Sequence, residues 1–92
     1  MTQGQAEILA LQALGWLAAE EDLLGVFLGA GGVTHNDLRE RAQDPEVLAA
    51  VLDFILMDDA WIMGFVTAAS IQPETVLQAR GALPGGADPH WT

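Results

Sequence analysis

The segment DPEVLAAVLDFILMDDAW, residues 44–61, decides the fold of this chain. Its first three residues form a helix start. Aspartate caps free backbone N–H groups, proline fits the first turn, and glutamate favours the positive end of the helix dipole. The residues that follow are apolar on nearly every side of a helix, which is typical of a helix at the centre of a bundle. We therefore expect a central helix that begins at Pro45.

The same segment predicts where this central helix ends. If the helix continued unbroken, Asp59 would lie in line with Leu52 and Ile55, and burial of its carboxylate would be costly. A break near Met57 lets Asp58 cap a new helix instead. The segment therefore predicts two helices that meet at a corner.

Elsewhere, apolar residues recur at three- and four-residue spacing, which is the periodicity of helices rather than strands. This spacing predicts an all-α, single-domain orthogonal bundle of five or six short helices. The first helix carries a wide apolar stripe, so we expect it to be covered on more than one side. The expected helices span residues 3–19, 21–28, 35–42, 45–57, 59–69 and 73–81.

The expected bundle domain covers residues 1–83, and residues 84–92 form an expected flexible tail that is rich in proline and glycine. Trp16 and Trp61 fall in apolar helical rows and are expected in the core. Trp91 follows the proline and glycine residues and lies next to His90. An exposed tryptophan is a typical interface anchor, so both residues are candidates for partner binding. The alternative is that Trp91 folds onto its own domain.

Composition excludes several classes of protein. The 92 residues include 13 acids and 3 bases, and the formal charge of −10 opposes binding to nucleic acid or to an anionic membrane surface. The longest uncharged stretches, residues 8–19, 23–36 and 60–73, are too short to span a membrane. There is no cysteine, which fits a reducing compartment, and no basic residue precedes the first apolar segment. We therefore expect a cytoplasmic protein.

Short sequence motifs occur along most of the chain. They are Leu23-Leu24, Phe27-Leu28-Gly29, Asp37-Leu38-Arg39, Asp44-Pro45, Val51-Leu52-Asp53-Phe54, Met57-Asp58-Asp59-Ala60-Trp61, Ala82-Leu83-Pro84-Gly85-Gly86 and His90-Trp91. This set resembles a bacterial family of small all-helical proteins known only as a domain of unknown function. The resemblance implies an all-α single domain of bacterial, cytoplasmic origin, and it implies no activity, ligand or catalytic residue.

The adjacent acids Asp58 and Asp59 have several possible interpretations. If the pair marks a helix start, Asp58 caps the helix N-terminus and Asp59 interacts favourably with the helix dipole. As a metal or acid/base site, the pair would act with Asp53 and His35. Adjacent residues do not share a helix face, however, and no Glu-x-x-His or His-x-x-x-His spacing supplies further ligands.

The three arginines offer partners for these acids. In a third interpretation, Asp58 or Asp59 bonds to Arg80 or Arg39 across the bundle. Asp53 lies within the most apolar helix, so it needs an arginine or a free backbone donor if it is buried. We therefore interpret Asp53, Asp58, Asp59 and Arg80 as structural polar residues. Asp37 and Arg41 have the i,i+4 spacing of a favourable helix ion pair.

The sequence contains few residues that could act as a nucleophile. Ser70 is the single serine, it falls at an expected helix end, and cysteine, lysine and tyrosine are absent. We therefore expect no catalytic residue, no cofactor and no enzymatic activity. The leading hypothesis is a non-catalytic interaction or regulatory module with a protein partner or a second copy. The alternative is a metal- or ligand-binding accessory subunit that uses Asp53, Asp58 and Asp59.

Overall fold

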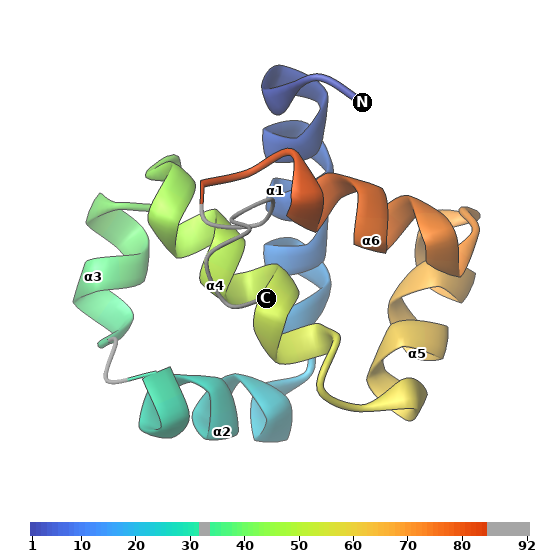
Figure 1. Cartoon of the computed structure of the whole chain (residues 1–92). Helices are drawn as coiled ribbons and strands as arrows, with labels where there is room; N and C mark the ends of the chain where they lie inside the picture. The colour runs from blue at the N-terminus through green and yellow to red at the C-terminus, as the bar shows by residue number, and fades with distance from the viewer. Residues whose placement is uncertain (32–33, 85–92) are drawn as a thin grey trace, which may run out of the picture.

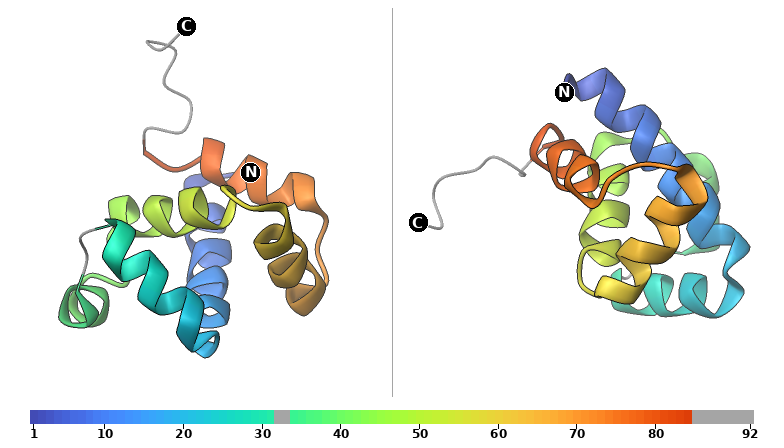
Figure 2. Two further views of the ribbon diagram at one scale, coloured as in Figure 1. Left: turned by 90° about the horizontal axis from the view of Figure 1, so that it is seen from below. Right: turned by 90° about the vertical axis from the view of Figure 1, so that its right-hand side faces the viewer.

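A computed structural model describes residues 1–31 and 34–84, and every regular element within them is an α-helix (Figure 1). The helices cross one another at steep angles (Figure 2), which confirms the all-α orthogonal bundle. The expected tail beyond Pro84 lies outside the described residues. The helices are α1 (Gln3–Ala19), α2 (Glu21–Gly31), α3 (His35–Glu40), α4 (Pro45–Ile55), α5 (Asp59–Ala69) and α6 (Pro73–Gly81).

Side-chain caps set the starts of α1 and α3. The Thr2 hydroxyl accepts a hydrogen bond from the Gln5 backbone N–H at 3.1 Å, and the Gln5 side chain accepts one from the Thr2 N–H at 3.0 Å. Thr34 and Asp37 exchange the same two bonds, at 3.0 and 3.2 Å. Each capping box satisfies two backbone donors that have no partner within the helix.

The break between α4 and α5 lies where the sequence places it. Asp44 Oδ1 accepts from the Glu46 N–H at 2.9 Å at the start of α4, and Asp58 Oδ1 accepts from the Ala60 N–H at 2.8 Å at the start of α5. Because the chain turns at this point, Asp59 sits in the first turn of α5 and is exposed rather than buried against α4.

The core is built around α4, which supplies more buried side chains than any other described helix. Both α1 and α4 contact α2, α5 and α6, and they also contact each other. This arrangement confirms that α4 lies at the centre of the bundle. The buried side chains of α4 belong to Val47, Leu48, Ala49, Val51, Leu52, Phe54 and Ile55.

The expectation that α1 is covered on more than one side is wrong. Its inner face is buried, including Leu9, Ala13 and Leu17. The second apolar row is exposed, and the side chains of Ile8 and Leu11 keep 62% and 37% of their accessible surface. The periodicity locates apolar residues correctly, but the helices that contact α1 also have to cover α4, and they leave the outer side of α1 open.

Three helix ends also differ from the prediction, and the first is that of α4, which ends at Ile55 rather than at residue 57. Helix α2 continues through Gly29 to Gly31, three residues beyond the expected end, because glycine permits a helix stop without enforcing one. Helix α3 ends at Glu40 rather than at residue 42, with Arg41 as its C-cap.

Arg41 pairs with Asp44 rather than with Asp37. Its Nη2 and Nε atoms donate to Asp44 Oδ2 at 2.8 and 3.1 Å, whereas Asp37 is engaged in the capping box of α3. The Arg41 side chain, and secondly the Glu46 backbone N–H, hold the pKa of Asp44 below its usual value of 3.8. The carboxylate thus links the end of α3 to the start of α4.

This lowered pKa predicts a pH-dependent contribution of Asp44 to stability. The contribution is present above pH 3.8 and is lost as the pH falls through the lower folded-state pKa. Asp44→Asn keeps a capping oxygen and removes the charge, so we expect it to lower the urea midpoint at neutral pH. The gap to the wild type should close below pH 3.8. A gap of unchanged size in acid would contradict this account.

Candidate functional site

An open apolar hollow lies between α1 and α5. It has a volume of about 450 Å³ and is lined by Gln12, Trp16, Phe65, Ala68 and Ala69. The Gln12 amide is the one polar side chain among these five residues. The volume falls within the range of known binding pockets, and an apolar lining with a single polar group is typical of them. We call this feature the α1–α5 hollow.

The position of Trp16 shapes the hollow and depends on a glycine. A Cβ atom built on Gly64 would lie 2.9 Å from Cζ2 of Trp16, so the indole packs where a side chain on α5 would otherwise be. The Trp16 ring is tilted against the Phe65 ring, with 6.1 Å between their centroids. Trp16 packs against the core, but it is less deeply buried than the sequence predicts, because its ring forms a wall of an open hollow.

Trp61 likewise packs against the core and is half-buried rather than fully buried. Its ring stacks on that of Phe54, with 4.5 Å between the centroids and 18° between the planes. This stack joins the first turns of α5 to the C-terminal end of α4. Trp61 therefore braces the corner between these helices.

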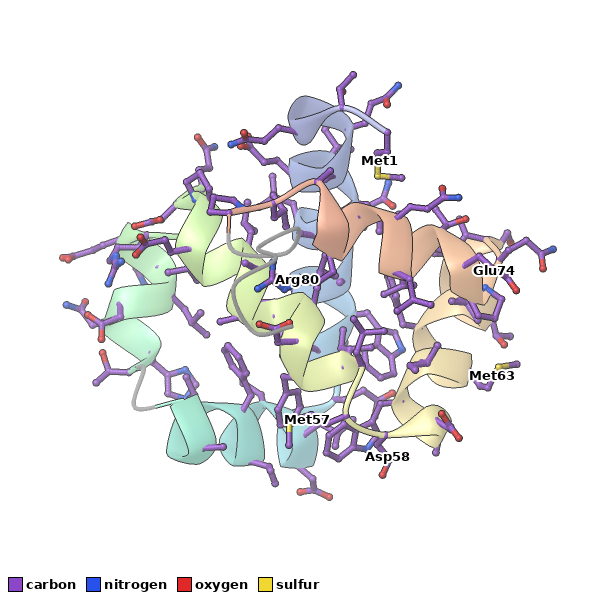
Figure 3. All side chains as sticks on the ribbon, viewed as in Figure 1. Met1, Met57, Asp58, Met63, Glu74 and Arg80 are labelled. Carbon is purple, nitrogen blue, oxygen red and sulfur yellow. The ribbon has the colours of Figure 1, made fainter. Side chains whose placement is uncertain are left out.

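The helix segments on either side of the hollow carry no charge. Residues 8–19 of α1 and residues 60–69 of α5 contain no acid or base, although the chain holds 13 acids. Exposed apolar side chains lie within both stretches, and Met63, which keeps 53% of its surface, projects outward from α5 (Figure 3). We call the exposed parts of these two stretches, together with the hollow, the charge-free surface. Exposed apolar areas and depletion of charge are both features of protein interfaces.

A second and smaller hollow lies between α2 and α4. Its volume is about 180 Å³, and its lining includes Phe27, Phe54 and Met57. Met57 is the most exposed large apolar side chain in the described residues, at 74%. Asp53 also lines this hollow, so a carboxylate stands at its edge. The α2–α4 hollow therefore differs from the charge-free surface in carrying a charge.

Asp53 lies on the outer side of α4 and is bonded to Arg80. The Asp53 side chain is 56% exposed, so Asp53 is not buried, although it lies within the most apolar segment of the chain. Arg80 Nε donates to Asp53 Oδ1, and Arg80 Nη1 donates to the Pro84 carbonyl at 3.0 Å. Arg80 projects across the face of α4 (Figure 3), and its own side chain is only 18% exposed. It therefore joins α4, α6 and the segment that follows α6.

The remaining candidate acids are not brought together. Asp58 caps α5, Asp59 is exposed in the next turn, and His35 lies at the start of α3 on the opposite side of the molecule (Figure 1). Arg80 bonds to Asp53, so it does not form the expected alternative pair with Asp58 or Asp59. Within residues 1–31 and 34–84, no three histidine or acidic side chains are placed to hold a metal ion.

Ser70 is the C-cap of α5 in the left-handed conformation, with φ of 58°, and its N–H bonds to the Val66 carbonyl. His90 and Trp91, the candidate partner-binding residues, lie outside the described residues. None of the described helices combines the length and apolar character that crossing a membrane requires.

The Arg80 contacts predict a measurable coupling to Asp53. We expect Arg80→Ala to lower the free energy of unfolding by about 1 kcal/mol, at the low end for a charged hydrogen bond because Asp53 is largely exposed. A double-mutant cycle with Asp53→Ala should give a coupling of about 0.5 kcal/mol in urea denaturation. Arg39→Ala removes the same charge from an exposed position on α3 and is the control. A coupling of zero would show that the pair contributes nothing.

The packing of Trp16 against Gly64 predicts opposite effects for two Gly→Ala variants. Gly64→Ala forces the indole to shift, and we expect it to lower the free energy of unfolding by about 1–2 kcal/mol. Gly15→Ala places its Cβ in open space on α1, and it should raise the free energy by about 0.5–1 kcal/mol through helix propensity. Urea denaturation measures both variants. A stabilising Gly64→Ala would contradict the close approach of Trp16.

Comparison with known proteins places the chain in a family. Searches of the curated proteins and of the solved structures found no match. A family model described as "Protein of unknown function (DUF3572)" matches residues 3–86, a range that contains all six described helices. The match confirms the resemblance to a domain of unknown function. The chain belongs to the DUF3572 family of proteins of unknown function.

Proposed function

We propose that this protein is a non-catalytic, cytoplasmic protein–protein interaction module that binds through its charge-free surface. The observation that carries the proposal is the α1–α5 hollow, an open apolar depression between two helices whose lining residues bear no charge. Apolar surface gains about 25 cal/mol per Å² when it is removed from water. A partner that fills the hollow would therefore stabilise the complex.

The lining of the hollow fits the known anatomy of protein interfaces. Trp16 offers an aromatic wall that is only partly buried in the free protein, so a partner can cover its remaining surface, whereas the Phe65 ring beside it is already buried. Tryptophan is prominent among the residues that dominate binding energy at interfaces. The Gln12 amide at the edge can both donate and accept hydrogen bonds, which would orient the partner.

The same lining supports a non-catalytic role. General acid–base catalysis needs a titratable group within hydrogen-bond reach of the substrate. The five side chains around the hollow include no titratable group. Binding by shape and by apolar burial is therefore the chemistry that the α1–α5 hollow favours.

A site-specific crosslinking experiment tests this proposal. A benzophenone amino acid in place of Gln12 reports on the hollow, and the same substitution at Gln78, which is exposed on α6, is the matched control. In cells that express the protein, we expect position 12 to form protein adducts on irradiation and position 78 to form few. Ala68→Glu, which places a charge in the hollow, should suppress the adducts at position 12.

Two outcomes would contradict the proposal. One is an absence of adducts at position 12, and the other is equal labelling from both positions. His90 and Trp91 remain predicted partner-binding residues, and the proposal for the hollow does not depend on them. Trp91→Ala in the same experiment measures whether they add to binding at this surface.

A further inference from the structure

We infer that the partner bound at the charge-free surface is a second copy of this chain, paired about a two-fold axis. The inference rests on the proposed function, because it names the occupant of the same surface. It follows from the distribution of charge over the molecule and from the composition of that surface.

Charge limits how two copies can meet. Each copy has a formal charge of −10, so any pairing that sets acids opposite acids is repulsive. Of the three arginines, Arg41 is bonded to Asp44 and Arg80 to Asp53 within the same chain. Few cations are therefore available to offset the acids of a second copy. The charge-free surface lets two copies approach through residues 8–19 of α1 and 60–69 of α5, which carry no carboxylate.

Symmetry favours the same surface. In a two-fold dimer one patch faces its own copy, so the patch must be complementary to itself. An uncharged apolar surface meets this condition without paired opposite charges. Homodimer interfaces are about 65% apolar, whereas other interfaces are about as apolar as the remaining protein surface. A cationic partner would instead be drawn towards the faces that carry the acids.

The α2–α4 hollow is the competing surface within the described residues. It is apolar and bordered by the exposed Met57, but Asp53 contributes to its lining. A two-fold dimer centred on this hollow would bring two Asp53–Arg80 ion pairs into the interface, and their desolvation costs binding energy. The α1–α5 hollow is larger and has no charge in its lining, so it is the preferred interface.

Two glycines provide a matched pair of test variants. Gly15 lies one turn from Gln12 on the exposed side of α1, and Gly25 is exposed on α2. A Cβ atom at either position meets no atom within 4 Å, so a larger side chain fits without strain. Gly15→Glu and Gly25→Glu therefore add the same charge and side chain on different faces. In the inferred dimer, only Gly15→Glu places a carboxylate in each half of the interface.

Sedimentation velocity of the purified chain, from micromolar to near-millimolar concentration, measures the dimer directly. We expect a concentration-dependent dimer for the wild type and for Gly25→Glu. Gly15→Glu should raise the dimer dissociation constant at least tenfold. Circular dichroism and urea denaturation establish that both variants are folded. The isosteric pair Gln12→Glu and Gln78→Glu repeats the comparison, and we expect only the first to weaken the dimer.

The outcomes separate the inference from the proposed function. A wild type that stays monomeric throughout overturns the inference, as does dissociation by Gly25→Glu with no effect of Gly15→Glu. If the chain is monomeric while position 12 crosslinks to a different protein, the proposed function stands and the partner is not a second copy. If the chain is monomeric and position 12 forms no adduct, both fail.

Discussion

Burial of α4 is the constraint on which the rest of the structure depends. Leu48, Val51, Leu52 and Ile55 are fully removed from water, and four other helices contact α4 to achieve this. The chain turns after α4 at Asp58, so that the following acid stays in solvent and α5 can fold back against the core. The polar edge of α4 is held by the bond from Arg80 to Asp53.

Because the other helices turn their inner sides towards α4, their outer sides stay exposed. A chain of 92 residues can bury only about 60–65% of the surface that its unfolded form exposes. The acids are concentrated at helix starts, where they satisfy backbone donors and favour the helix dipole, and residues 8–19 of α1 and 60–69 of α5 are left without charge. Exposed apolar helix bodies and charged helix ends together produce the charge-free surface. Acidic residues that cap a helix or lie in its first turn are Glu21, Asp22, Asp37, Asp44, Glu46, Asp58, Asp59 and Glu74.

Most of the fold was predictable because helix starts depend on local chemistry. Most of the site was not predictable because it depends on how the helices pack against one another. The caps at Thr34 and Asp58 depend on nearby backbone groups, so their residue types were sufficient signals. The exposure of Ile8 was not predictable, because the apolar periodicity of α1 does not show how many other helices are available to cover each of its sides. The hollow depends on Gly64 facing Trp16 across the bundle, which no local pattern encodes. The uncharged stretches at residues 8–19 and 60–69 were the available signal for this surface.

The central claim is that α1 and α5 together form the binding surface of this protein, and that a second copy occupies it. Backbone amide NMR spectra, recorded from low micromolar to near-millimolar concentration, test this claim residue by residue. The account predicts that the concentration-dependent shifts cluster at residues 8–19 and 60–69. Shifts that cluster on α2 and around Met57, or spectra that do not change with concentration, would contradict it.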